Sequence, residues 1–129
     1  MTLSITPLYG GLVGLLFVLL SVRVILRRRA ARISVGTGDD KDLRKRIRAQ
    51  ANCAEYAPIG LILLAMAELQ GAPGWVVHLL GLMLLAGRLL HAYGFGSTPQ
   101  VVRARWIGMA LTFLMLIVAA AANIGHSIT

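Results

Sequence analysis

The chain has 129 residues, of which 57% are hydrophobic and 14% are charged. Soluble domains usually contain about 45–50% apolar and about 25% charged residues, so the composition excludes an ordinary soluble protein and indicates one membrane domain. The formal net charge of +8 would suit a nucleic-acid-binding protein, but the basic residues are clustered between apolar segments.

Four apolar segments follow one another along the chain. A hydrocarbon core of about 30 Å needs roughly 20 apolar residues per helix. Lipid cannot satisfy free backbone polar groups, so each segment is expected to be helical. The predicted spans are residues 4–27, 49–69, 74–94 and 104–125. We therefore predict an all-α fold, an integral membrane four-helix bundle, in which residues 1–129 form a single transmembrane domain.

The basic residues mark the connection between the first two spans. Nine of the thirteen Lys and Arg residues lie between positions 27 and 48, whereas the second connection and the C-terminal tail have none. The first and third connections share one side of the membrane, which the positive-inside rule assigns to the cytoplasm. We predict a basic cytoplasmic loop over 28–48, both termini outside, and no nucleic-acid partner. Asp39 or Asp40 is expected to cap the second helix.

The stretch RIRAQANCAEYAPIG, residues 46–60, carries polar groups into the second span. At about 100° per residue, Arg48, Asn52 and Glu55 fall within an arc of about 60°, with Gln50 and Tyr56 to either side. Ionisable groups in a span are costly and usually face a cavity or a partner. Two interpretations remain open: a network that fixes helix packing, or a site for a polar ligand near the cytoplasmic edge.

The third and fourth spans add further candidates. In GRLLHAYGF, Arg88 and His91 share a helix face with Phe95. His91 is either a packing residue or a functional one. Arg103 and Arg105 open the fourth span, where they either contribute to a site or only follow the positive-inside rule.

Two further residues complete the inventory. Cys53 is the single cysteine, which excludes an intrachain disulfide and a cysteine-based metal cluster. We expect it to be a small buried apolar residue, and we expect no metal. Glu68, at the outer end of the second span, is expected to be a solvated carboxylate without a role.

The run RAQANCAEYAP, followed about 30 residues later by GRLLHAYGF, resembles the MAPEG family (membrane-associated proteins in eicosanoid and glutathione metabolism). The resemblance covers nearly the whole chain. It implies a four-helix membrane protein that assembles as a homotrimer and binds glutathione, as co-substrate, between adjacent protomers. His91 and Phe95 stand where the eicosanoid branch has tyrosines. The chain therefore looks like a bacterial-type member, and an eicosanoid substrate is disfavoured.

The resemblance also implies residue roles. Arg105, with Arg103 as second choice, would face and stabilise the glutathione thiolate, because a guanidinium favours the ionised thiol. Arginines suit the two glutathione carboxylates and a glutamate suits its ammonium group. The expected glutathione-binding set is Arg28, Arg48, Gln50, Asn52, Glu55, Tyr56, Arg88 and His91. Arg27 or Arg29 could take the place of Arg28 in this set.

The resulting hypothesis is a membrane-bound, glutathione-dependent transferase or peroxidase that acts on hydrophobic electrophiles, in the inner membrane if the source is bacterial. The partners expected are the lipid bilayer, glutathione, a hydrophobic small molecule and two further copies of the chain. The alternative is a non-catalytic MAPEG-like protein that binds a lipid or a partner. A small multidrug-type transporter is disfavoured because the first span contains no acidic residue.

Overall fold

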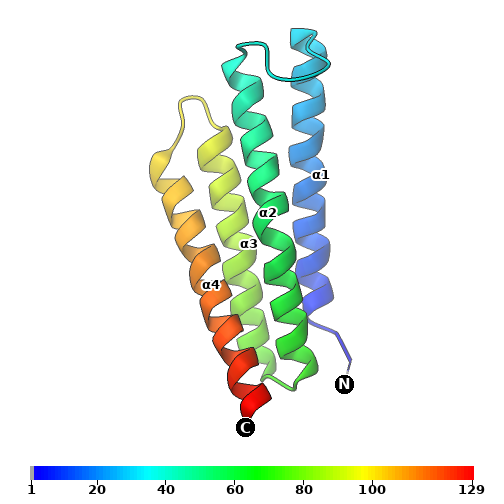
Figure 1. The fold of residues 1–129 in the computed structure, drawn as a ribbon, viewed down its shortest axis with the longest axis vertical. Helices are drawn as coiled ribbons and strands as arrows, with labels where there is room; N and C mark the ends of the chain where they lie inside the picture. Colours follow the sequence, from blue (N-terminus) through cyan, green and yellow to red (C-terminus); the bar gives the residue numbers. More distant parts are fainter. Residues whose placement is uncertain (1) are drawn as a thin grey trace.

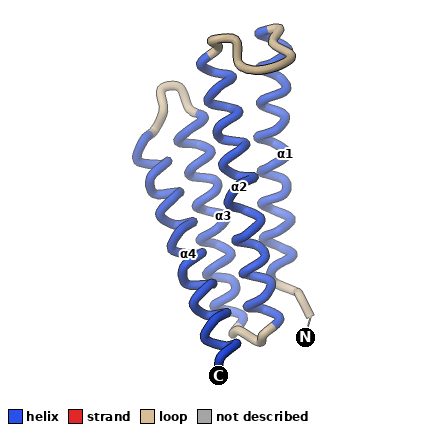
Figure 2. The backbone as a smooth tube through the Cα atoms, in the orientation of Figure 1, coloured by secondary structure: helices blue, strands red, loops and turns tan. Residues whose placement is uncertain are grey.

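In a computed structural model, the described part of the chain, residues 2–129, forms four helices and no strand. The helices are α1 (Thr6–Ala31), α2 (Lys41–Leu69), α3 (Gly74–Gly96) and α4 (Val102–Ile128). They run alternately up and down, with loops only at the two ends (Figure 1 and Figure 2). Each helix is long and apolar enough to cross a membrane. The prediction of an all-α protein with four membrane spans is confirmed.

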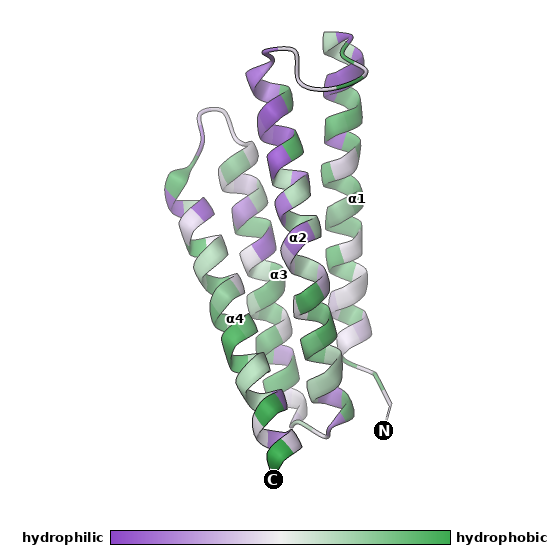
Figure 3. Ribbon diagram, in the orientation of Figure 1, coloured by the Kyte–Doolittle hydropathy of each residue, from purple (hydrophilic) through white to green (hydrophobic). Residues whose placement is uncertain are grey.

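The bundle places α2 and α3 in the middle and α1 and α4 on the flanks. Helix α1 packs against α2 and α3, and α4 packs against α3 and α2. Both termini lie at one end, opposite the loops that follow α1 and α3 (Figure 1). The outer faces are apolar: Leu15 is 70% exposed and Ile117 is 65% exposed. Hydrophilic residues gather instead on the upper half of α2 (Figure 3). This is the polarity expected of a bundle surrounded by lipid.

The observed helices are longer than the predicted spans, chiefly at the basic end. The first connection covers residues 32–40 rather than 28–48, because α1 continues to Ala31 and α2 begins at Lys41. At the other boundaries, α3 ends at Gly96, and α4 runs from Val102 to Ile128. The predicted spans followed the apolar lengths of the segments. A helix continues beyond hydrocarbon as long as caps and ion pairs satisfy its ends.

Asp40 is the residue that starts α2 and ties it to α1. Its carboxylate accepts a hydrogen bond from the Leu43 backbone N–H at 2.7 Å, and the Arg27 guanidinium donates to it at 2.6 Å. Asp40 is thus the N-cap, one of the two residues predicted for this position. The hydrogen bond from Arg27 holds the pKa of the Asp40 carboxyl below its ordinary value. This contact therefore stabilises the fold at neutral pH, and its contribution is lost as the pH falls through that lowered pKa.

Helices α3 and α4 approach each other closely at a pair of glycines. A Cβ atom on Gly108 would lie 2.6 Å from the Gly87 carbonyl oxygen and 2.5 Å from the His91 backbone nitrogen. Only glycine permits this backbone contact, as in other close helix crossings in membranes. The crossing places the Arg88–His91 turn of α3 directly against α4.

Glu68 has a role that corrects the expectation of a free, solvated carboxylate. Helix α1 begins without a side-chain cap of its own. Glu68, at the end of α2, accepts hydrogen bonds from the backbone N–H groups of Ser4, Ile5 and Thr6, each at 2.7 Å. The Thr6 hydroxyl also donates to it, at 2.6 Å. Because the first N–H groups of a helix lack partners and carry partial positive charge, Glu68 caps α1 from another helix.

We expect Glu68→Gln to loosen the start of α1 without unfolding the bundle. The amide removes the negative charge and one of the two acceptor oxygens, so amide hydrogen exchange at Ile5 and Thr6 should accelerate by about ten-fold or more. Hydrogen exchange with mass spectrometry in detergent measures this. Gln70→Ala, two positions on, is the matched control and should leave exchange unchanged. Equal exchange in wild type and Glu68→Gln would contradict the capping role.

Candidate functional site

Arg88 occupies the centre of the bundle and is 1% exposed. Its Nε and Nη2 atoms donate to the Thr112 hydroxyl of α4 at 3.2 and 3.0 Å. Its Nη1 atom donates to the backbone carbonyl of Asn52, at 3.2 Å, and to the Asn52 side-chain oxygen. Nη2 also lies 3.2 Å from the Met109 sulfur. Every guanidinium nitrogen is thus engaged within the protein. Arg88 therefore links α3 to α2 and α4 and fixes Asn52, rather than offering free donors to a ligand.

Arg48 and Glu55 form an ion pair on the outer face of α2. Arg48 Nη1 lies 3.7 Å from Glu55 Oε1, and the two side chains are 51% and 52% exposed. Tyr56 directly follows Glu55 along α2, and its ring stacks edge-on against Phe113 of α4, with ring centroids 5.5 Å apart. The Arg88 guanidinium also lies 5.5 Å from the Tyr56 ring. Tyr56 thus connects the exposed pair to the buried network.

A groove of about 340 Å³ runs along α3 and α4 beside Phe113. The Arg105 guanidinium lies at its rim, held 4.3 Å over the Phe95 ring and bonded to the Gln100 side-chain oxygen at 2.9 Å. The His91 ring also lies beside Phe95, with centroids 5.6 Å apart. The residues lining the groove are His91, Arg105, Trp106, Met109, Ala110 and Phe113. This arrangement offers an apolar, aromatic surface with one cation at its edge.

Three of the predicted site residues, Gln50, Arg28 and Arg103, lie apart from the Arg48–Glu55 pair and from the groove. Gln50 points toward α1, where its Nε2 atom lies 3.5 Å from the Ser21 hydroxyl. Arg28, at the end of α1, donates to the backbone oxygens of Gly36 and Ile33 in the following loop, at 2.8 and 3.3 Å. Arg103 is exposed and does not line the groove. Within one chain, therefore, Asn52 and Tyr56 connect α2 to Arg88 and to Phe113 of the groove, whereas Gln50 and Arg28 make their contacts elsewhere.

Sequence reasoning named Arg105 of α4 but missed three other residues of this helix. Thr112, Met109 and Phe113 complete the Arg88 network and the groove, yet none was a candidate. Thr112 carried a signal, because it is a lone hydroxyl within the apolar run 106–119. Polar side chains inside a membrane span usually pair with another helix. Nothing in the sequence distinguished Met109 and Phe113 from ordinary lipid-facing residues.

Arg88→Lys should destabilise the protein in the absence of any ligand. A lysine ammonium cannot reach Asn52 and Thr112 together, because it lacks the planar fork of the guanidinium. Losing one or two charged hydrogen bonds predicts a loss of roughly 3 kcal/mol in the free energy of unfolding. Thermal unfolding in detergent, followed by circular dichroism, measures this, with the exposed Arg29→Lys as control. Stability equal to wild type would show that Arg88 does not hold the helices together.

The chain is similar to one protein family and to several known proteins. The MAPEG family matches residues 6–125. The inner membrane protein YecN of Escherichia coli (strain K12) is 38% identical over 122 residues, covering 95% of this chain and 92% of its own. Leukotriene C4 synthase of Cavia porcellus is 36% identical over 106 residues, covering 75% of this chain and 70% of its own. The enzyme of the same name from Mus musculus is 33% identical over 107 residues, with 76% and 71% coverage.

Proposed function

Since the chain belongs to the MAPEG family, we propose that it is a membrane-bound, glutathione-dependent transferase or peroxidase for hydrophobic electrophiles. Its four spans and its similarity to YecN support an integral multi-pass protein of the inner membrane. Its similarity to leukotriene C4 synthases supports chemistry that involves glutathione. The loops 32–40 and 97–101, beside which the lysines and arginines of the adjoining helix ends are clustered, would face the cytoplasm, where glutathione is available, and both termini would face outward.

The exposed Arg48–Glu55 pair is the observation that carries this proposal. Half of each side chain is uncovered on the flank of a helix that crosses the membrane. Charged groups left against hydrocarbon cost several kcal/mol on insertion scales, about 2.5–3.5 per residue at the centre of a span. Such a pair therefore calls for a polar ligand, a second protein surface, or both.

Glutathione has the groups that this face would bind. Arg48 would bind a carboxylate through its fork of N–H donors, and Glu55 would bind the ammonium group. Asn52, held by Arg88, would present its remaining side-chain hydrogens to the peptide, beside the Tyr56 hydroxyl. In the bound state the ligand would replace the long 3.7 Å ion pair with several shorter charged hydrogen bonds.

A homotrimer would complete the site. Gln50 and Arg48 are about 160° apart around α2 at about 100° per residue, so one glutathione cannot touch both in a single chain. A neighbouring copy that brings its α1 side against the exposed stripe would add its own Gln50 and Arg28. The same contact would cover the Arg48–Glu55 pair from lipid. The proposed site is therefore shared between protomers.

Arg105 would supply the chemistry at the groove. Its guanidinium would stabilise the glutathione thiolate, and the apolar groove beside it would hold the electrophile. In transfer, the sulfur forms a bond to carbon while the leaving group departs with the bonding electrons. In peroxide reduction, the thiolate attacks one peroxide oxygen, giving an alcohol and a glutathione sulfenic acid. A second glutathione then yields the disulfide and water. Among the two helix-four arginines, the groove favours Arg105 over Arg103.

Glutathione binding is the first test. Titration calorimetry on the detergent-purified protein should give micromolar-to-millimolar affinity. Arg48→Ala and Glu55→Gln should each weaken binding by about ten-fold or more, because each removes a charged hydrogen bond to the ligand. Lys41→Ala, which removes an exposed cation that belongs to no candidate site, is the control. If wild type does not bind glutathione, the proposed function is wrong and the stripe serves helix or subunit packing.

Turnover measurements distinguish Arg105 from Arg103. With chlorodinitrobenzene or cumene hydroperoxide as electrophile, Arg105→Gln should lower kcat by about 100-fold while glutathione affinity changes little, as expected for a group that acts on the developing thiolate. Arg103→Gln should retain wild-type turnover. Binding without turnover in wild type, across several electrophiles, would instead support the non-catalytic alternative.

A further inference from the structure

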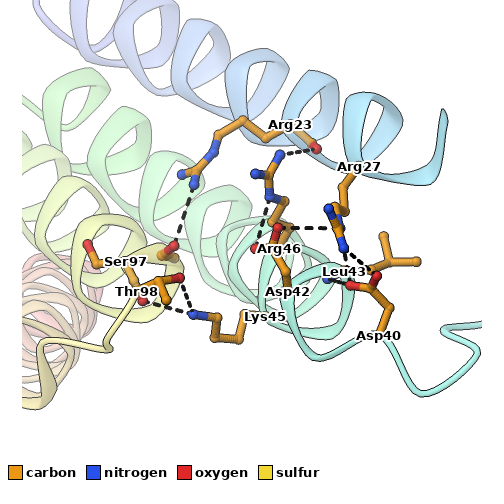
Figure 4. Close-up of polar contacts among 10 residues, drawn as sticks. Arg23, Arg27, Asp40, Asp42, Leu43, Lys45, Arg46, Ser97 and Thr98 are labelled. Atoms are coloured by element: carbon orange, nitrogen blue, oxygen red, sulfur yellow. Dashed lines mark hydrogen bonds and ion pairs between the residues drawn. The ribbon is translucent and has the colours of Figure 1, made fainter. Parts of the chain in front are cut away.

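Besides the apolar groove, the protein has a polar pocket of about 630 Å³ between α1, α2 and the loop after α3. The side chains that matter here are Arg23 of α1, Arg46 of α2 and the hydroxyl residues Ser97 and Thr98 of the loop (Figure 4). Arg46 donates to the Arg23 backbone carbonyl at 2.9 Å, which fixes its position beside α1. The pocket is therefore built from three separate parts of the chain.

The pocket carries more positive than negative charge. Asp42 is its acidic residue, and it is shared: Arg46 lies 3.2 Å away and Arg27 lies 3.4 Å away. Arg23 pairs with no carboxylate in residues 2–129, and its guanidinium makes only a long hydrogen bond to the Gly96 carbonyl, at 3.5 Å. Lys45 adds a further cation beside the loop after α3. Its Nζ atom donates to the Ser97 backbone carbonyl at 3.0 Å and to the Thr98 hydroxyl at 2.7 Å.

Arg23 retains donors that the protein does not use. No hydrogen bond engages its Nη1 atom, nor the Nη2 atom of Arg46, in the part of the chain that the structure describes. A Cβ atom on Gly96 would lie 3.1 Å from Arg23 Nη1, so glycine leaves room for the guanidinium at this point. An oxyanion placed between the two arginines would accept from both, as phosphate does from arginine forks elsewhere.

The depth of the pocket matches the level of lipid headgroups. Arg23 lies eight residues before the end of α1, or about 12 Å at a rise of about 1.5 Å per residue. The loop after α3, whose residues line the pocket, lies lower than the loop after α1 (Figure 1), so the pocket lies below the tip of the bundle. Tyr93, 61% exposed, and Val101, 36% exposed, are among its lining residues. An exposed tyrosine beside apolar residues is typical of the membrane interface.

We propose that this pocket binds the phosphate headgroup of an anionic phospholipid. Arg23 and Arg46 hold the phosphate oxygens, the Thr98 hydroxyl donates to the headgroup, and the acyl chains descend over the apolar edge. Basic pockets between membrane helices on the cytoplasmic side recognise anionic headgroups in this way. The binding would also join α1 to the α3–α4 loop, beside the hydrogen bond from Arg23 to the carbonyl of Gly96, the last residue of α3.

The lining of this lipid site has no residue in common with the proposed glutathione-binding set, although Arg46 lies one turn before Gln50 on α2. Arg46 and Arg48 are two positions apart on α2 and so lie about 160° apart around the helix. The inference does not rest on the proposed function, and each can fail without the other.

Native mass spectrometry of the full chain in neutral detergent tests the lipid site. Wild type should retain phosphatidylglycerol in preference to phosphatidylcholine. The double variant Arg23→Gln/Arg46→Gln should bind phosphatidylglycerol about 25-fold more weakly, at about five-fold per arginine near a membrane surface. Arg29→Gln/Arg44→Gln, which removes the same charge from exposed positions, should bind as wild type does. Size-exclusion elution and circular dichroism check folding, and the single Arg23→Gln replaces the double variant if that variant does not fold.

Three outcomes would overturn the proposal. They are equal retention of the two lipids, an equal loss in the control variant, and unchanged retention in the Arg23 variants. Inorganic phosphate at millimolar concentration distinguishes the source of the anion. If it displaces phosphatidylglycerol as effectively as added lipid does, the pocket takes a free phosphate and the lipid assignment is wrong. If it does not, the acyl chains contribute and the assignment stands.

Discussion

The hydrogen bonds of the Arg88 guanidinium to Asn52 and Thr112 are the contacts on which the rest of the bundle depends. An arginine in the middle of a membrane protein is tolerated only if its donors find acceptors inside the protein. The closeness of α3 and α4 at Gly87 and Gly108 makes this possible, because it brings Thr112 within reach. Asn52 then fixes the rotation of α2, and that rotation decides which residues of the polar stripe face outward.

Charged side chains on the membrane-spanning helices of this protein are accommodated in two different ways. Arg88 is buried and saturated, so it belongs to the architecture. Arg48 and Glu55 are half uncovered and joined by one long contact, so they lie on the surface of the single chain. Both kinds of residue look equally anomalous in an apolar sequence. They differ in exposure, since Arg88 is 1% exposed and the side chains of Arg48 and Glu55 are about half exposed.

The basic end of the bundle combines topology with specific contacts. The positive-inside rule needs only charge near the membrane, and several arginines there, such as Arg29 and Arg44, are simply exposed. Others are used individually. Arg27 bonds the cap of α2, Lys45 fastens the loop after α3, and Arg23 and Arg46 form the walls of a pocket. At the opposite end a single carboxylate, Glu68, performs the corresponding task for α1.

The sequence by itself determined the number and type of helices and the polar face of α2, because hydropathy and a period of 3.6 residues are local properties. It also indicated Asp39 or Asp40 as the cap of α2, and the tertiary structure decided for Asp40. It could not determine where the helices end in water, that Glu68 caps a helix more than 60 positions away, or that Arg88 is saturated and Gln50 faces α1. Those facts depend on how the helices rotate and cross, and the Gly87–Gly108 contact and the Arg88 hydrogen bonds set that geometry only once all four helices are packed.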